Sequence, residues 1–375
     1  MRKARETWVG TWMTAPQLTD PANLPPPPGF VNQTVRQLVR VSLGGQRLRV
    51  RLTHTHGTTP VTFTGVHIAL GLPGGKIVPG SSRALLFHGE PEVTIPAGNL
   101  IVSDPLDFPL TPFSDLAITF HVNTSTTAIT GHPGSRCTSY FQTGRSLAAP
   151  EFPSPVPVDH WYFLAGVEVV AENATAVVAL GDSITDGRGT PTNGNGRWTD
   201  YLARRLQAYP KTRHVAVLNA GIGGNCVIQG GLGPSALARL DRDVLAQPGA
   251  RYLILFEGIN DLGTKSADAE ALIAAYQQIL ARVRARNFTV YGATILPCGK
   301  SFYDTPVLAR DRQAINQWIR TSGSFDAVLD FDAALRDPTT PTRLSAAAES
   351  TDFLHPANLG YKVLADSIPL RLFYP

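Results

Sequence analysis

Four short motifs carry side chains that could together perform nucleophilic chemistry. An apolar run over residues 176–180 leads into Gly181-Asp182-Ser183, so a serine hydroxyl stands at the end of a predicted buried strand. Two later apolar runs end in Asn219–Asn225 and in Glu257–Asp261, and the C-terminal region contains Asp352-Phe353-Leu354-His355. A serine becomes a nucleophile when a histidine takes its proton, and an aspartate can orient that histidine.

Each motif alone also has a purely structural interpretation. Gly-Asp-Ser is common in turns, and His355 before Pro356 could start a helix with Asp352 as its cap. The glycine-rich run over residues 221–233 could hold a phosphate, although no lysine followed by serine or threonine accompanies it. The occurrence of all four motifs in this order favours one shared active site over separate turns.

The first part of the chain, to about residue 170, has the pattern of antiparallel β structure. Apolar and polar residues alternate, which is typical of strands with one wet face. Gly44-Gly45 between two of these runs suggests a hairpin, and clusters of proline and glycine mark turns throughout the region. The predicted strands cover residues 39–43, 48–52, 61–64 and 116–122. A β-sandwich or jelly roll is therefore expected.

After about residue 172 the pattern changes to strand, loop and helix. The clearest predicted helix covers residues 267–286, with apolar residues on one face and arginines in its last turn. The predicted strands cover residues 176–180, 215–218, 252–256, 289–295 and 327–329. This alternation indicates a parallel sheet with helices on both faces, in which ligands bind beyond the carboxyl ends of the strands.

Serine, glycine, asparagine and histidine in these contexts resemble the SGNH/GDSL hydrolase family over residues 172–375. Residues 187–198 and the opening Trp8–Gln17 resemble the branch of this family that has an N-terminal β domain. Ile184 follows the serine where the family name records leucine, a residue of similar volume. The resemblance implies a flavodoxin-like three-layer α/β/α hydrolase domain over 172–375, preceded by an antiparallel, jelly-roll-like β-sandwich domain over 1–171.

The chemistry then assigns a role to each residue. Ser183 is the predicted nucleophile, His355 its base, and Asp352 the group that orients the imidazole. The expected oxyanion donors are the backbone N–H groups of Ser183 and Gly224 and the side-chain amide of Asn260. Esters of short acyl groups, above all acetyl groups, are the expected substrates, and the β domain favours esterified carbohydrates by analogy. Alternatives are an aryl or short-chain lipid esterase, an acyltransferase and, remotely, a non-catalytic carbohydrate-binding protein.

Three other residues near the motifs have simpler expected roles. Trp198 is expected to pack in the core more than to line a pocket. Asp182 is expected to accept backbone hydrogen bonds in the turn. Cys226 is expected to be a spectator thiol, since no histidine is assigned to it.

Composition limits the classes of protein and partner. A charged fraction of 17% and a formal net charge of +4, without a long basic run, argue against nucleic acid as a partner. No stretch approaches 18 apolar residues, so no membrane span is expected. Three cysteines without zinc spacing predict neither a disulfide scaffold nor a metal site, and no cofactor is expected. The opening residues lack the apolar region of a signal peptide; the protein is expected to be secreted if one has been removed and cytoplasmic otherwise. The sequence assigns no oligomeric state.

Overall fold

The computed structural model describes residues 6–126 and 128–375, which form two compact units. The first unit comprises the chain up to Glu172 together with Thr192–Gly194. The second comprises Asn173–Pro191 and Asn195–Pro375. The basic opening of the chain, on which the expectation about a signal peptide rests, includes residues 1–5, which lie outside the described residues.

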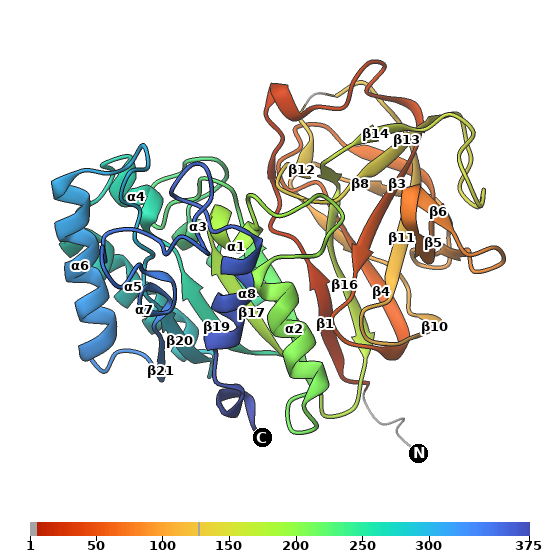
Figure 1. Ribbon diagram of the computed structural model, residues 1–375. Coiled ribbons are helices and arrows are strands. Elements are labelled where there is room, and N and C mark those ends of the chain that lie inside the picture. Colours follow the sequence, from red (N-terminus) through yellow and green to blue (C-terminus); the bar gives the residue numbers. More distant parts are fainter. Residues whose placement is uncertain (1–5, 127) are drawn as a thin grey trace. The chain divides into compact units, whose positions relative to one another are not determined.

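The first unit is built from antiparallel sheets (Figure 1). One sheet has the order β1-β16-β4-β10, with β9 paired to β4; a second has the order β14-β13-β3-β11-β5-β6, with β7 and β8 paired to β5; a small third sheet has the order β15-β12-β2. The strands are β1 (Trp8–Met13), β2 (Gln17–Leu18), β3 (Phe30–Arg40), β4 (Gly45–Thr53), β5 (Val61–Leu72), β6 (Lys76–Ile77), β7 (Arg83–Leu85), β8 (Val93–Ile95), β9 (Leu100–Val102), β10 (Leu106–Leu110), β11 (Asp115–Thr124), β12 (Thr130–His132), β13 (Ser139–Thr143), β14 (Val156–Val158), β15 (Trp161–Tyr162) and β16 (Leu164–Val170). The predicted antiparallel character is confirmed, whereas the jelly-roll arrangement stays a prediction.

Strand β11 lies between β3 and β5 and is buried on both faces, not on one as the alternating pattern predicts. On one face, Phe120 packs edge-on against Phe63 and Phe163. On the other, Thr119 accepts a hydrogen bond from the fully buried Arg36. Arg36 also donates to two loop carbonyls, so loops cover the face that the sequence assigns to solvent.

The predicted hairpin at Gly44-Gly45 is wrong. Strand β3 ends at Arg40, and the next strand, β4, belongs to the other large sheet. In the connection, the Val41 N–H donates to the Ser114 carbonyl, and the Ser42 N–H donates to the Thr11 carbonyl. These bonds to two different neighbours carry the chain from one sheet to the other, whereas a hairpin would have kept it in the same sheet.

The second unit contains a parallel sheet with the order β18-β17-β19-β20-β21 (Figure 1). In chain order its strands are β17 (Thr175–Gly181), β18 (Val215–Gly221), β19 (Ala250–Phe256), β20 (Thr289–Ala293) and β21 (Ala327–Leu329). All five strands predicted for this region are present. Numbered 1 to 5 along the chain, they lie in the order 2-1-3-4-5, so the order of strands across the sheet changes direction beside β17. Strands β17 to β19 are buried in their centres, as expected for apolar runs covered on both faces.

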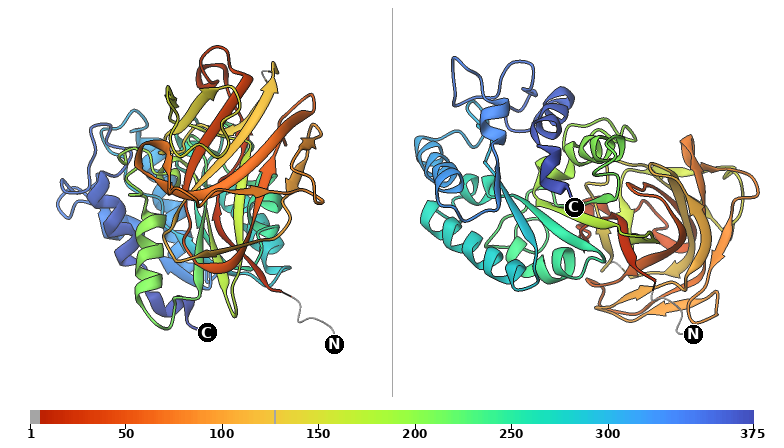
Figure 2. Two further views of the ribbon diagram at one scale, coloured as in Figure 1. Left: turned by 90° about the vertical axis from the view of Figure 1, so that its right-hand side faces the viewer. Right: turned by 90° about the horizontal axis from the view of Figure 1, so that it is seen from below.

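Helices lie on both faces of this sheet (Figure 2). Helix α2 packs against α8 on one face, and α5 packs against α6 on the other. The helices are α1 (Ser183–Asp186), α2 (Trp198–Ala208), α3 (Ala236–Leu240), α4 (Ile259–Gly263), α5 (Ala269–Arg284), α6 (Pro306–Thr321), α7 (Phe331–Leu335) and α8 (Asn358–Ser367). The predicted helix over 267–286 is confirmed as α5, which begins after Asp268 because that side chain caps the Ala271 N–H. Among the described residues, no helix has the length and apolar character needed to cross a membrane.

The pairing register brings three strand ends to one level. Gly181 at the end of β17 is paired with Gly221 on β18 and with Phe256 on β19. Because the strands are parallel, the loops that follow them leave the sheet at the same edge. The motifs of the predicted site therefore start side by side.

Candidate active site

Ser183 is the first residue of helix α1, two positions after strand β17 ends. Asp182 precedes it as the cap of this helix, and its Oδ1 accepts a hydrogen bond from the Ile184 N–H at 2.8 Å. This bond holds the sharp turn, as expected for Asp182. Ser183 is only 6% exposed. A buried turn with a capped helix start thus sets the direction of the hydroxyl.

The structure brings Ser183, His355 and Asp352 into one chain of contacts. The Ser183 Oγ lies 2.7 Å from His355 Nε2, although the two residues are 172 positions apart in the sequence. His355 Nδ1 lies 2.7 Å from Asp352 Oδ2. With Nδ1 protonated, Nε2 carries the free lone pair and faces the hydroxyl. This tautomer lets the imidazole accept the serine proton.

Asp352 is held by its own loop. Its Oδ1 accepts hydrogen bonds from the Ser350 hydroxyl and from the N–H groups of Leu354 and His355, at 2.7–3.0 Å. Burial acts to raise the pKa of Asp352, but these hydrogen bonds and the one from the His355 ring outweigh it and lower the pKa well below its usual range. The carboxylate therefore stays charged, and both its oxygens are fixed. Asp352 does not cap a helix, because α8 begins later, after Ala357.

Gly224 and Asn260 follow the two strands that flank β17. Gly224 has a φ of +68°, a conformation that favours glycine, and no hydrogen bond in the described part of the chain uses its N–H. Asn260 is 4% exposed and lies in the first turn of α4. Its Nδ2 donates to the Asn225 carbonyl at 2.9 Å, and its Oδ1 accepts from the Tyr303 hydroxyl at 3.2 Å. An amide nitrogen has two hydrogens, so one remains for a further acceptor.

The loop after Gly224 is anchored by residues whose roles the sequence analysis leaves unassigned. The Asp261 carboxylate accepts hydrogen bonds from the N–H groups of Val227 and Ile228 at 2.9–3.2 Å. Asn225 Nδ2 donates to the carbonyls of Leu232 and Pro234. These bonds hold a glycine-rich loop in one shape, which positions the Gly224 N–H.

Arg239 on α3 ties the ends of three neighbouring strands together. Its guanidinium donates to the carbonyls of Gly181 on β17 and Ala220 on β18, at 3.1 and 2.6 Å, and to Asn225 Oδ1 at 3.0 Å. Its Nη2 lies 3.9 Å from the carboxylate of Glu257, which follows β19. The side chain is fully buried. No signal in the sequence indicates this role, because arginine in a short helix is usually exposed.

Glu257 lies in the same buried region. Neither of its carboxyl oxygens has a hydrogen-bond partner among the described residues. Burial raises the pKa of Glu257 well above its usual range, and the attraction of Arg239 only partly opposes this. Burial likewise raises the pKa of Asp182 to about 7. Acidic groups behind the nucleophile turn thus tend to hold their protons.

Two side chains near the motifs have the structural roles expected of them. Trp198 is fully buried and packs against Phe331 and Phe256, so the packing interpretation is confirmed. Cys226 is buried, and burial raises the pKa of its thiol to about 11. A thiol that stays protonated is a poor nucleophile.

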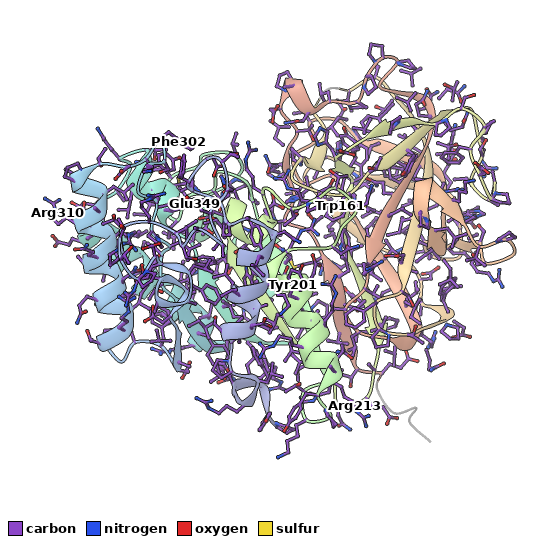
Figure 3. All side chains as sticks on the ribbon, viewed as in Figure 1. Trp161, Tyr201, Arg213, Phe302, Arg310 and Glu349 are labelled. Atoms are coloured by element: carbon purple, nitrogen blue, oxygen red, sulfur yellow. The ribbon has the colours of Figure 1, made fainter. Side chains whose placement is uncertain are left out.

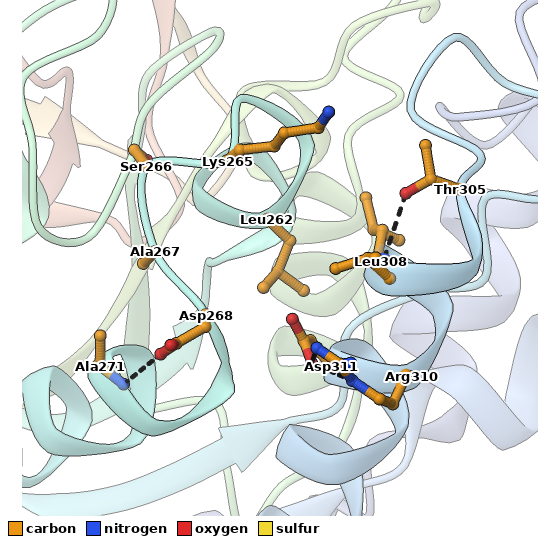
Figure 4. A pocket seen from close by; sticks show the side chains of 11 residues that line it. Leu262, Lys265, Ser266, Ala267, Asp268, Ala271, Thr305, Leu308, Arg310 and Asp311 are labelled. Atoms are coloured by element: carbon orange, nitrogen blue, oxygen red, sulfur yellow. Dashed lines mark hydrogen bonds and ion pairs between the residues drawn. The ribbon is translucent and has the colours of Figure 1, made fainter.

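A separate cavity of about 470 Å³ lies between the loop after α4 and the first turns of α5 and α6 (Figure 4). Helix caps form part of its wall: Asp268 accepts from the Ala271 N–H, and Thr305 accepts from the Leu308 N–H. Its lining contains none of the predicted site residues. Within the described residues, no group of three His, Cys, Asp or Glu side chains is arranged to hold a metal ion.

In the second unit, the serine hydroxyl contacts the histidine, and the histidine contacts the aspartate. This arrangement beside a parallel sheet is the site geometry of a serine hydrolase. Comparison with protein families agrees with this class. Residues 179–363 match the model of the GDSL-like Lipase/Acylhydrolase family. The second unit of the chain belongs to this family, and the chain is an ester hydrolase.

Solved structures of a G-D-S-L family protein and of an acetylxylan esterase are each similar to about half of this chain. A protein of the G-D-S-L family from Desulfitobacterium hafniense DCB-2 is 24% identical, with a TM-score of 0.41, and the match covers 52% of this chain and 97% of that one. An acetylxylan esterase, Axe2 from Geobacillus stearothermophilus, is 22% identical, with a TM-score of 0.40, over 52% of this chain and 94% of that one. A search of curated proteins found no match.

Proposed function

We propose that this chain is a serine esterase that cleaves carboxylic esters through an acyl-enzyme. His355 Nε2 takes the proton of the Ser183 hydroxyl as Oγ forms a bond to the ester carbonyl carbon. The imidazolium then returns this proton to the leaving alcohol as the ester C–O bond breaks. Water repeats the sequence on the acyl-enzyme and releases the carboxylic acid. The charged Asp352 stabilises the imidazolium in both halves.

The oxyanion of each tetrahedral intermediate would lie between three donors. These are the backbone N–H groups of Ser183 and Gly224 and the remaining Nδ2 hydrogen of Asn260. Such donors stabilise charge that is present mainly in the transition state, and removing one typically costs about 10²–10³ in kcat. An amide at position 260 donates without adding negative charge next to the oxyanion, which a carboxylate would do.

The observation that carries this proposal is the pair of 2.7 Å contacts from Ser183 through His355 to Asp352. The test is Ser183→Ala on p-nitrophenyl acetate. We expect kcat to fall by roughly 10⁴-fold or more, because the nucleophile is lost. Circular dichroism should stay unchanged, since the side chain loses only one oxygen. Hydrolysis that continues undiminished in Ser183→Ala would contradict the serine mechanism.

We further propose that the acyl group is short. Leu232, which is 56% exposed, lies against Gly224: a methyl group added to Gly224 would be 3.1 Å from Leu232 Cδ1. This side chain occupies space beside a proposed oxyanion donor, and we propose that it limits the length of the acyl chain. Wild type should therefore prefer acetyl to longer acyl groups in a series of p-nitrophenyl esters from acetyl to decanoyl.

Leu232→Ala tests this limit. We expect kcat/KM for hexanoyl and longer esters to rise about tenfold relative to acetyl, because a pocket methylene is worth about 1–3 kcal/mol in discrimination. Leu359→Ala is the matched control, since Leu359 is a similarly exposed leucine, 53%, on α8. An acyl-chain profile that is the same in Leu232→Ala and wild type would contradict the role of Leu232.

The identity of the alcohol is a separate part of the proposal. We propose that residues 1–171 act as a β domain that favours esterified carbohydrates and that residues 172–375 act as the hydrolase domain. The test compares kcat/KM for acetylated oligosaccharides with kcat/KM for p-nitrophenyl acetate. A clear preference for the oligosaccharides supports the carbohydrate assignment, and a preference for the aryl ester contradicts it. Ester products formed in the presence of added alcohols would instead indicate acyl transfer.

A further inference from the structure

The loop after strand β20 carries a tyrosine whose hydroxyl contacts the proposed oxyanion residue. Tyr303 donates from its hydroxyl to Asn260 Oδ1 at 3.2 Å. The two residues are 43 positions apart and belong to different strand–helix connections. No role in the reaction described above requires a tyrosine, so this contact needs an explanation of its own.

The contact decides which way the amide of Asn260 points. Tyr303 donates to Oδ1, and on the other side Nδ2 donates to the Asn225 carbonyl. A flipped amide would place Nδ2 against a hydroxyl and Oδ1 against a carbonyl, and two acceptors would then face each other. The remaining Nδ2 hydrogen therefore keeps a single direction. A donor at Oδ1 also polarises the amide and strengthens its N–H as a donor.

The hydroxyl is well suited to remain a donor. Burial raises the pKa of Tyr303, as does the nearby Cys226. The turn that carries the ring is closed by local hydrogen bonds: the Tyr303 N–H donates to Ser301 Oγ at 3.2 Å, and the Lys300 N–H donates to Asp304 Oδ2 at 2.8 Å. The ring is thus presented by an ordered turn.

A second, independent feature keeps the ring in place. Gly263, the last residue of α4, lies under it: a Cβ at this position would be 2.5 Å from three ring carbons of Tyr303. Because Gly263 has no side chain, the aromatic ring can approach α4, the helix that carries Asn260. Phe302 is next to this ring, with centroids 4.4 Å apart, but is 73% exposed at the surface (Figure 3).

We propose that Tyr303 is a positioning residue for the oxyanion donor Asn260, with Gly263 providing the space for its ring. This inference rests on the proposed esterase function. Tyr303 contacts no reacting atom and acts only through the amide of Asn260. Its loss should therefore weaken stabilisation of the transition state and leave binding of the ground-state ester nearly unchanged.

The first test is Tyr303→Phe, which keeps the ring and removes the hydroxyl. With p-nitrophenyl acetate we expect kcat to fall about tenfold, less than the roughly 10²–10³ for loss of a whole donor, with KM within about twofold of wild type. Gly263→Ala should cause a similar fall, because its methyl group displaces the ring. Tyr201→Phe is the matched control: it also removes a tyrosine hydroxyl that donates to an asparagine Oδ1, that of Asn358 at 3.5 Å, and should leave kcat unchanged.

The decisive test repeats Tyr303→Phe in an Asn260→Ala background. If Tyr303 acts through Asn260, removing its hydroxyl should lower kcat by less than about twofold once the amide is gone. An equal loss in both backgrounds, or an unchanged kcat in Tyr303→Phe alone, would overturn the proposal. Serine dependence of the wild-type activity is measured first with Ser183→Ala. Wild-type activity that does not depend on Ser183 would contradict the esterase function itself. An equal loss of kcat from Tyr303→Phe with and without Asn260 contradicts only the positioning role.

Discussion

Asp352 shows how one side chain can be specified by its nearest neighbours in sequence. Ser350, Leu354 and His355 lie within three residues of it, and all donate to its carboxylate. One oxygen serves the loop and the other serves the imidazole. The charge and the direction of the hydrogen bond to His355 are therefore both set locally, which makes this residue the clearest test of the histidine tautomer.

We predict that Asp352→Asn lowers kcat by roughly 10³–10⁴-fold on p-nitrophenyl acetate. The amide would present an N–H group to His355 Nδ1 and favour the tautomer with its proton on Nε2, which cannot accept the serine proton. Asp366→Asn is the control, because Asp366 is an exposed aspartate that pairs with Lys362 on α8. A kcat within tenfold of wild type in Asp352→Asn would argue against its orienting role.

At the scale of secondary-structure elements, the parallel sheet aligns the strand ends and Arg239 links them. Hydrogen bonds from Arg239 reach Gly181, the last residue of β17, and Ala220 near the end of β18, and the same side chain faces Glu257 after β19. It also contacts the buried Asp243 at 3.2 Å. Helix α3 therefore supports the edge of the sheet from which Ser183 and Gly224 project.

We predict that Arg239→Met lowers the free energy of unfolding by about 3–5 kcal/mol. The substitution removes the buried donor to the Gly181 and Ala220 carbonyls and to Asn225 Oδ1, and it takes from the buried Asp243 one of the two arginines that pair with it. Urea unfolding of the full chain measures this loss. Arg242→Met is the matched control, since Arg242 also pairs with Asp243 but is 23% exposed, and should cost about 1 kcal/mol or less. Equal losses in the two variants would contradict the special position of Arg239.

For the molecule as a whole, buried acids link stability to pH. The pKa of Asp182 is raised to about 7 by burial, so the folded protein keeps a proton that the unfolded chain releases near pH 4. Raising the pH between these values therefore favours the unfolded chain. Buried histidines act in the opposite direction: burial lowers the pKa of His54, so at low pH the unfolded chain is favoured by the proton it binds there, and this penalty on the folded protein disappears as the pH rises. A comparison of one variant with wild type separates these contributions.

We predict that Asp182→Asn gains stability relative to wild type as the pH rises from about 4 to about 7. Asparagine cannot ionise, so the variant avoids a penalty of about 1.4 kcal/mol per pH unit in this window, and the difference should level off above pH 7. His54 and the other histidines are present in both proteins and cancel in the difference. Urea unfolding at intervals from pH 4.5 to 8 measures it, and parallel stability curves would contradict the prediction.

Much of the fold and of the candidate site could be predicted from the local sequence pattern and from the regular geometry of parallel strands. The apolar run before Ser183 predicts a buried strand, and β17 is buried between two neighbouring strands. The parallel sheet brings the ends of β17, β18 and β19 together. Asp352 and His355 are close in sequence, so their contact needs only one turn. The sequence wrongly predicts a hairpin at Gly44-Gly45, because two glycines favour a tight turn locally. The chain instead passes from one sheet to the other through hydrogen bonds of Val41 and Ser42 to Ser114 and Thr11, which form only in the packed unit.

By itself, the sequence determined the candidate nucleophile, base and orienting acid and the edge of the sheet where they lie. These depend on spacing within a motif and on the regular geometry of parallel strands. Only the tertiary structure decided that Arg239 joins the strand ends and that Tyr303 holds the amide of Asn260. Both contacts connect residues 43 or more positions apart, and only the packing of their loops and helices brings them within hydrogen-bonding distance.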